Sequence, residues 1–135
     1  MRTLGSIFLI YFAVHSAPSS ASEKVSEIQV LQQMAFESLM CQSFAKFARN
    51  DSELKWVVYE NDVERSNYSA DLAQTIAENS LSANDVNQLY SVVGARYLNA
   101  SDKMKNELKA MGSVEKKKSG EAFIEKCRSV WDLLS

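Results

Sequence analysis

The sequence has little of the residue types that build most catalytic and metal sites. It contains one histidine, one proline and two cysteines among 135 residues. The histidine and the proline are His15 and Pro18, and both fall in an N-terminal segment that we expect to be removed. Without imidazole, the remaining chain has no Ser-His-Asp or Cys-His nucleophilic site, no histidine zinc site and no histidine pH switch. We therefore expect a protein that is not an enzyme and needs no cofactor or metal.

The N-terminal segment has the layout of a secretory signal peptide. A basic residue precedes an apolar run at 7–14, and a proline and several small residues follow it. The run is too short to span a bilayer. We expect cleavage after Ala21, with Ser16 as the second choice. This predicts a signal peptide of residues 1–21 and a periplasmic or secreted domain of residues 22–135.

Both cysteines, Cys41 and Cys127, belong to the expected mature protein. An even cysteine count in an exported chain is typical of an intramolecular disulfide. Such a bond would close most of the mature chain into one loop, which the chain-entropy model values at roughly 4 to 5 kcal/mol. A redox-active thiol is disfavoured because neither cysteine has a C-x-x-C partner. We expect a structural disulfide.

Few residues in the mature chain interrupt helices, since proline is missing and only three glycines remain. Apolar residues recur at helical spacing through most of it. We expect a single all-α domain, a bundle of about five helices whose first and last members carry the two cysteines. The expected helices are 23–49, 53–79, 83–98, 101–112 and a last one that follows Gly120. The segment 53–79 is expected to be one helix, with two helices joined near Ser66 as the alternative.

Charge is distributed unevenly along a chain whose formal net charge is −2. The middle is acidic, whereas the last third gathers lysines: Lys103, Lys105, Lys109, Lys116, Lys117 and Lys118. A solvated face explains these lysines better than a site for an acidic partner or a membrane surface. Nucleic acid is not expected, because the chain is acidic and no aromatic residues interleave with the lysines. No second apolar stretch predicts a membrane anchor.

The acidic middle segment has more aromatic and polar surface than its core stripe requires. Its stripe is Leu54, Val57 and Val58, and its aromatic residues lie partly on another side. Aromatic anchors rimmed by charge are typical of protein interfaces. A carboxylate pair for glycoside hydrolysis is the alternative, but a polar helix face explains the acids without chemistry. We expect partner binding by Trp56, Tyr59, Glu60, Asp62 and Glu64.

In layout alone, the chain resembles several families of small periplasmic helical proteins with a terminal cysteine pair. The shared features are the signal segment, Cys41 on the first helix and Cys127 on the last. These families are immunity proteins against cell-wall amidases of type VI secretion, phage-encoded inhibitors of lysozyme, and acid-stress chaperones. The resemblance implies an immunity or inhibitor protein that acts on a partner protein. A carrier or stress chaperone for apolar ligands or unfolded clients is the alternative, favoured by four mature methionines: Met34, Met40, Met104 and Met111.

Three N-x-S sequons begin at Asn50, Asn67 and Asn99. In a eukaryotic host they would predict that all three asparagines lie on the surface at helix ends or bends. In a bacterial host the sequons carry no such meaning.

Overall fold

The computed structural model describes residues 23–134, which form four helices and no strand. The helices are α2 (Glu23–Arg49), α3 (Glu60–Ser80), α4 (Ala83–Ala110) and α5 (Ser113–Leu134). The expected all-α fold is confirmed, with four helices in place of about five. The expected signal peptide, residues 1–21, and its cleavage sites lie outside the described residues.

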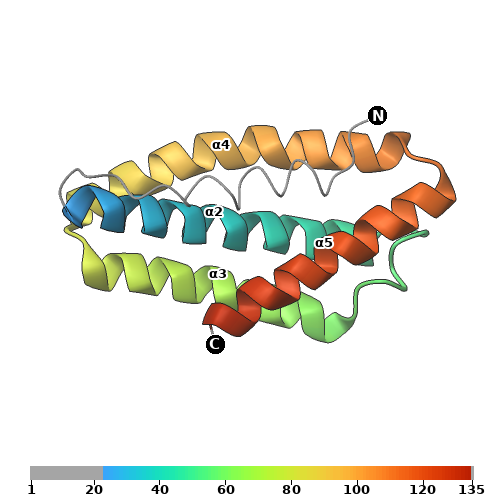
Figure 1. The fold of residues 1–135 in the computed structure, drawn as a ribbon, viewed down its shortest axis with the longest axis horizontal. Helices are drawn as coiled ribbons and strands as arrows, with labels where there is room; N and C mark the ends of the chain where they lie inside the picture. Colours follow the sequence, from blue (N-terminus) through green and yellow to red (C-terminus); the bar gives the residue numbers. More distant parts are fainter. Residues whose placement is uncertain (1–22, 135) are drawn as a thin grey trace.

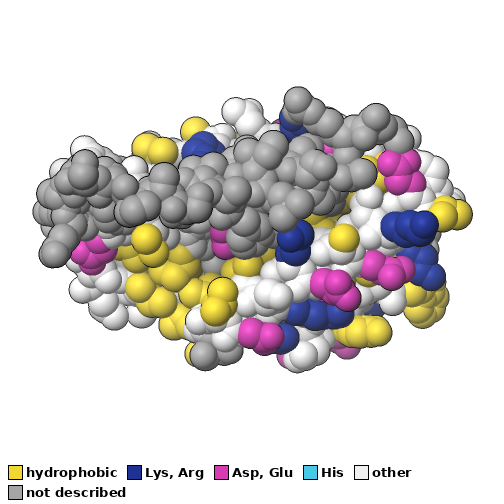
Figure 2. All heavy atoms as spheres, in the orientation of Figure 1, with side chains coloured by type: hydrophobic (Ala, Val, Ile, Leu, Met, Phe, Trp, Pro, Cys, Tyr) yellow, Lys and Arg dark blue, Asp and Glu magenta, His cyan; other side chains and the backbone are white. Residues whose placement is uncertain are grey.

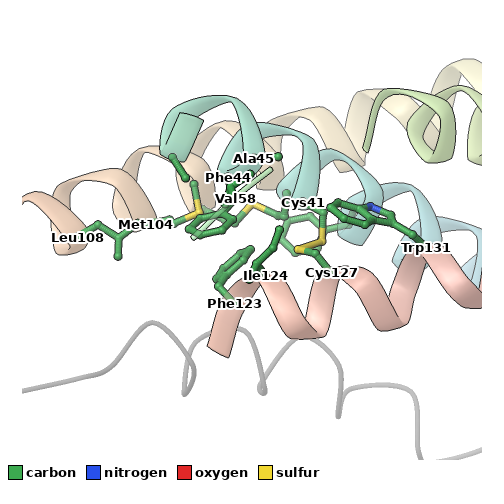
Figure 3. Close-up of a cluster of buried hydrophobic side chains, with 14 of the residues drawn as sticks. Cys41, Phe44, Ala45, Val58, Met104, Leu108, Phe123, Ile124, Cys127 and Trp131 are labelled. Carbon is green, nitrogen blue, oxygen red and sulfur yellow. A yellow bond between two sulfur atoms is a disulfide. The ribbon is translucent and has the colours of Figure 1, made fainter. Parts of the chain in front are cut away.

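The helix α2 is the centre of the bundle. It runs between α3 and α4, and α5 crosses it obliquely (Figure 1). Apolar side chains from α2, α4 and α5 fill the space between them, among them Phe44, Met104, Leu108, Phe123 and Ile124 (Figure 3). The rings of Phe44 and Phe123 stack with their centroids 4.4 Å apart. Each large side chain buried in this way stabilises the fold by about 1.5 to 3 kcal/mol.

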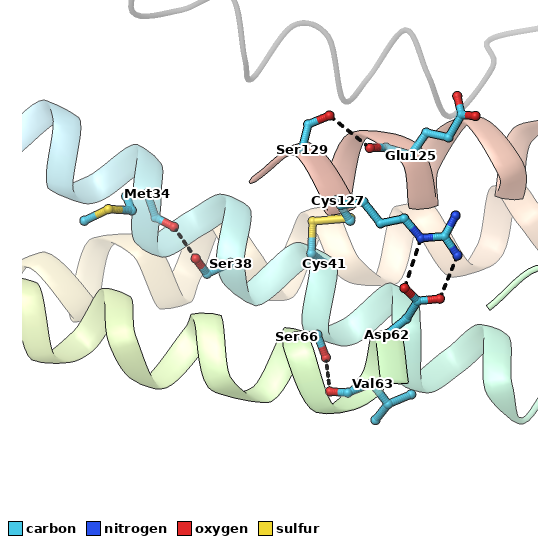
Figure 4. The surroundings of a disulfide bond; sticks show 10 residues. Met34, Ser38, Cys41, Asp62, Val63, Ser66, Glu125, Cys127 and Ser129 are labelled. Atoms are coloured by element: carbon cyan, nitrogen blue, oxygen red, sulfur yellow. Dashed lines mark hydrogen bonds and ion pairs between the residues drawn. A yellow bond between two sulfur atoms is a disulfide. The ribbon is translucent and has the colours of Figure 1, made fainter. Parts of the chain in front are cut away.

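A disulfide joins Cys41 of α2 to Cys127 of α5, as expected (Figures 3 and 4). The two Cα atoms lie 5.5 Å apart, within the range usual for disulfides. Both cysteines are fully buried. The bond therefore clamps the first described helix to the last from within the core.

The expected helix 53–79 is wrong in its first part, because residues 51–59 form turns and α3 begins only at Glu60. Asp51 closes a turn by accepting hydrogen bonds from the backbone amides of Glu53, at 2.9 Å, and Leu54, at 3.1 Å. Asp62 accepts a hydrogen bond from the amide of Tyr59, at 2.8 Å, and so caps the start of α3. The side chains that suggested a helical stripe are buried by this turn segment.

Residues 83–98 and 101–112 were expected to form two helices, but α4 runs through both without a break. The serine that suggested a new helix start, Ser101, does not cap one. Its hydroxyl is buried and shares a 2.7 Å hydrogen bond with the hydroxyl of Ser43 on α2. A buried hydroxyl needs such a partner, so Ser101 links two helices instead of starting one. Ser82, by contrast, caps α4: its hydroxyl oxygen accepts a hydrogen bond from the amide of Asp85.

The last helix begins earlier than expected, at Ser113, so Gly120 lies inside α5. A Cβ atom on Gly120 would lie 2.7 Å from the Cδ2 atom of Leu54. The glycine therefore permits close packing of the segment 51–59 on α5, and it does not mark a helix end.

Candidate partner-binding surface

The turn segment 51–59 has two exposed aromatic side chains. Trp56 is 74 % exposed and Tyr59 is 63 % exposed, whereas Leu54 and Val58 of the same segment are completely buried. The segment therefore has its own apolar anchor in the core and does not need its aromatic residues for packing. Large aromatic side chains exposed beside a well-packed anchor are typical of interaction surfaces.

An arginine at the end of α2 binds backbone carbonyl groups of the segment. One guanidinium nitrogen of Arg49 donates to the carbonyl oxygens of Lys55, at 3.0 Å, and Val58, at 3.3 Å. The Nζ atom of Lys55 in turn lies 4.9 Å from the centre of the Trp56 ring. These contacts fix the backbone on both sides of Trp56.

A buried lysine joins the start of the segment to α5. Lys116 is 5 % exposed, and its Nζ donates to Oδ2 of Asp51, at 2.9 Å, and to Oε1 of Glu53, at 3.1 Å. Burial alone would lower the pKa of Lys116, but the hydrogen bonds to both carboxylates outweigh it and raise that pKa. Ser113 also donates to Glu53. Lys116 is therefore part of the fold and not of a solvated lysine face.

An arginine on α5 holds the other end of the segment. Arg128 binds Asp62 side-on, with Nε 3.0 Å from Oδ1 and Nη2 2.8 Å from Oδ2 (Figure 4). Its Cζ atom also lies 5.4 Å from the centre of the Tyr59 ring. Asp62 was expected to contact a partner, but it is 3 % exposed and both oxygens are engaged. Its carboxylate positions Tyr59 and Arg128 instead.

Between the segment and α5 lies a hollow of about 230 Å³, which we call the aromatic hollow. Its lining includes Trp56, Tyr59, Lys117, Glu121, Glu125 and Arg128. Its two acidic residues, Glu121 and Glu125, are four residues apart on α5. Neither makes an ion pair within the described residues 23–134. The hollow is smaller than the usual 300 to 1,000 Å³ of a small-molecule site.

The structure separates the residues that were expected to act together. Glu60 is exposed at the start of α3, next to Tyr59. Glu64 is also exposed, but it borders a different hollow that includes Tyr68. The α5 residues of the aromatic hollow were missed, because nothing in their local sequence distinguishes them from an ordinary polar helix face.

The three sequon asparagines occupy different environments. Asn50 is exposed directly after α2, where a helix end was expected. Asn67 lies within α3 and accepts a 2.8 Å hydrogen bond from the side chain of Gln42. Asn99 is exposed but lies inside α4. Only Asn50 therefore lies at a helix end.

The sequence matches no protein-family model, and neither a curated protein nor a solved structure shows significant similarity to it. The disulfide indicates a non-reducing, extracytoplasmic environment. None of the described helices has the length and apolar character that crossing a membrane requires. Within residues 23–134, no three cysteine or acidic side chains are grouped so that they would hold a metal ion.

Proposed function

We propose that this is a non-enzymatic binding protein of the periplasm or the extracellular space, which acts on a partner protein as an immunity or inhibitor protein does. The partner would contact the aromatic hollow, with Trp56 and Tyr59 as anchors. Glu60 and Glu64 would lie at the rim and affect mainly the rate of association.

One observation carries the proposal. Two exposed aromatic side chains stand on a non-helical segment that partly buried ion pairs hold at both ends, through Lys116 and Arg128. A fixed segment loses little conformational freedom when it binds, so more of its contact energy appears as affinity. Exposed tryptophan and tyrosine are the side chains that most often dominate such interfaces.

Site-specific photocrosslinking tests the proposal. Trp56 is replaced by p-benzoylphenylalanine, and the exported protein is irradiated in its own compartment. Leu98 on α4, which is 63 % exposed, is the matched control position. We expect a discrete adduct from position 56 and none from position 98. Equal adducts from both positions, or no adduct from either, would overturn the proposal.

The affinity for the protein identified in that adduct gives the second measurement. Trp56→Ala should weaken it by about tenfold or more, as truncation of a central aromatic anchor usually does. Leu98→Ala should leave it unchanged. Circular dichroism shows that both variants remain folded.

A further inference from the structure

A second surface feature lies at the other end of α5. The last turn of α5 and the first half of α2 enclose an open apolar groove of about 330 Å³. Figure 2 shows hydrophobic side chains gathered on this part of the surface. Leu133 is 86 % exposed and Val30 is 59 % exposed, and Met34, Val130 and Leu134 complete the apolar lining.

A single ionisable side chain, Glu37, lines this apolar groove. Its Oε1 atom accepts a 2.6 Å hydrogen bond from Gln33, the other polar residue of the lining. No hydrogen bond to Oε2 of Glu37 is formed by the described residues. The α5 side chains that face the groove, Val130, Leu133 and Leu134, carry no charge.

We propose that the apolar groove binds a small amphiphile with a primary ammonium head, whose alkyl chain packs against Val30 and Leu133 and whose head donates to Glu37. A cation is the complementary ligand because the lining offers a carboxyl group and no positive charge. A charge-assisted hydrogen bond in a partly apolar site is stronger than a neutral one. The volume of the apolar groove, about 330 Å³, is within the range of small-molecule sites.

The titration of Glu37 agrees with this geometry. Burial raises its pKa to about 7, although the hydrogen bond from Gln33 acts in the opposite direction. No charged side chain contributes to this shift. A bound ammonium group would favour the ionised carboxylate and so lower the pKa of Glu37. Binding near pH 6 should therefore release a proton.

Titration with n-octylammonium, followed by the NMR methyl signals of Val30 and Leu133, tests the inference. Octanol and octanoate are the neutral and anionic comparison ligands of equal chain length. We expect octylammonium at pH 8 to bind about tenfold or more tightly than octanol, because only the cation forms a charge-assisted hydrogen bond. Octanoate should bind most weakly, and the octylammonium affinity should fall as the pH is lowered to 5.

Glu37→Gln provides the variant, since it keeps the size of the side chain and removes its charge. It should reduce octylammonium affinity to that of octanol, whereas Glu27→Gln, at an exposed position on the same helix, should change nothing. Equal binding of octylammonium and octanol would overturn the inference, as would an unchanged affinity of Glu37→Gln. So would shifts scattered outside the groove, which mark an adventitious additive only.

The apolar groove and the aromatic hollow can be tested independently of each other. Trp56→Ala should leave octylammonium binding intact, because Trp56 does not line the apolar groove. Glu37→Gln should likewise leave the photocrosslink at position 56 intact.

Discussion

The two hollows that α5 borders have opposite chemistry. Near the start of α5, Lys116 is buried in ion pairs with Asp51 and Glu53, which fix a segment that has no helical structure. Near its end, apolar side chains of α5 face α2 across a groove in which the charge of Glu37 has no partner charge. Paired charges thus order one surface, whereas at the other surface no charged side chain of residues 23–134 forms an ion pair with Glu37.

The two ends also respond to pH in opposite directions. Burial alone would raise the pKa of Asp51, but hydrogen bonds from Lys116 and two backbone amides lower it below its ordinary 3.8. Ser113 and Lys116 likewise lower the pKa of Glu53 below 4.5. These groups add stability that is present at neutral pH and is lost as the pH falls through their folded pKa values. The pKa of Glu37 is raised, so its contribution to the stability of the fold is fully present below pH 4.5. That contribution is lost as the pH rises through about 7.

The largest effect is expected from the disulfide, which lies between the two ends. The double variant Cys41→Ser, Cys127→Ser should lose about 4 kcal/mol of unfolding free energy, because the unfolded chain is no longer constrained. Denaturant unfolding measures the loss, and reductant should bring the wild-type protein close to the variant. Free thiols in freshly isolated protein would contradict the prediction. Hydrogen exchange of the double variant shows whether both ends of α5 open together.

Lys116 is buried, whereas its neighbour in sequence, Lys117, is exposed. Lys116→Met should cost about 2 kcal/mol, because it leaves the largely buried carboxylate of Asp51 without its cation. Lys117→Met should change stability by no more than about 0.5 kcal/mol, as expected for an exposed position. Equal effects in thermal unfolding would show that the Lys116 pairs do not stabilise the segment.

Close packing of the segment 51–59 on α5 gives the third prediction. Gly120→Ala places a methyl group against Leu54 and should cost about 1 to 2 kcal/mol by overpacking. Gly94→Ala is the matched control in α4, where nothing lies within 4 Å of the added methyl group. It should stabilise the protein by about 0.5 to 1 kcal/mol through helix propensity. A stabilising Gly120→Ala would mean that the segment moves away freely.

The parts of the fold that sequence predicted correctly depend on local signals. The boundaries of α2 follow from an uninterrupted apolar period and basic residues in its last turn, Lys46 and Arg49. The disulfide is the exception, because it was predicted from the even cysteine count of a chain that we expect to be exported. The start of α4 also has a local signal, because Ser82 has a side chain that suits an N-cap.

The errors arise where a distant residue decides the local structure. Leu54, Val57 and Val58 are spaced as on a helix, yet the same spacing suits a turn segment that buries all three. Lys116 binds Asp51 and Glu53 in this segment, and Gly120 lets Leu54 pack close to α5. Both residues belong to a helix much further along the chain. The aromatic hollow was half predicted for the same reason: Trp56 and Tyr59 were found, but the α5 wall was not.

The smallest expected effect concerns Glu37, and it tests the opposite pH responses directly. At pH 4 the carboxyl group is largely neutral in the folded protein, so Glu37→Gln should have nearly the stability of the wild type. At pH 8 the wild type must ionise a partly buried carboxyl, and Glu37→Gln should be more stable by about 1 kcal/mol, after allowance for the water that still reaches the group.

Glu27→Gln, on the exposed side of α2, is the control for this prediction and should show no such pH-dependent difference. Stability curves from pH 4 to 8 provide the measurement for all three proteins. If Glu37→Gln tracks the wild type over the whole range, the carboxylate is solvated at pH 8. The groove would then have no buried unpaired charge to recognise a cation, and the contrast between the two ends of α5 would reduce to a difference in apolar surface.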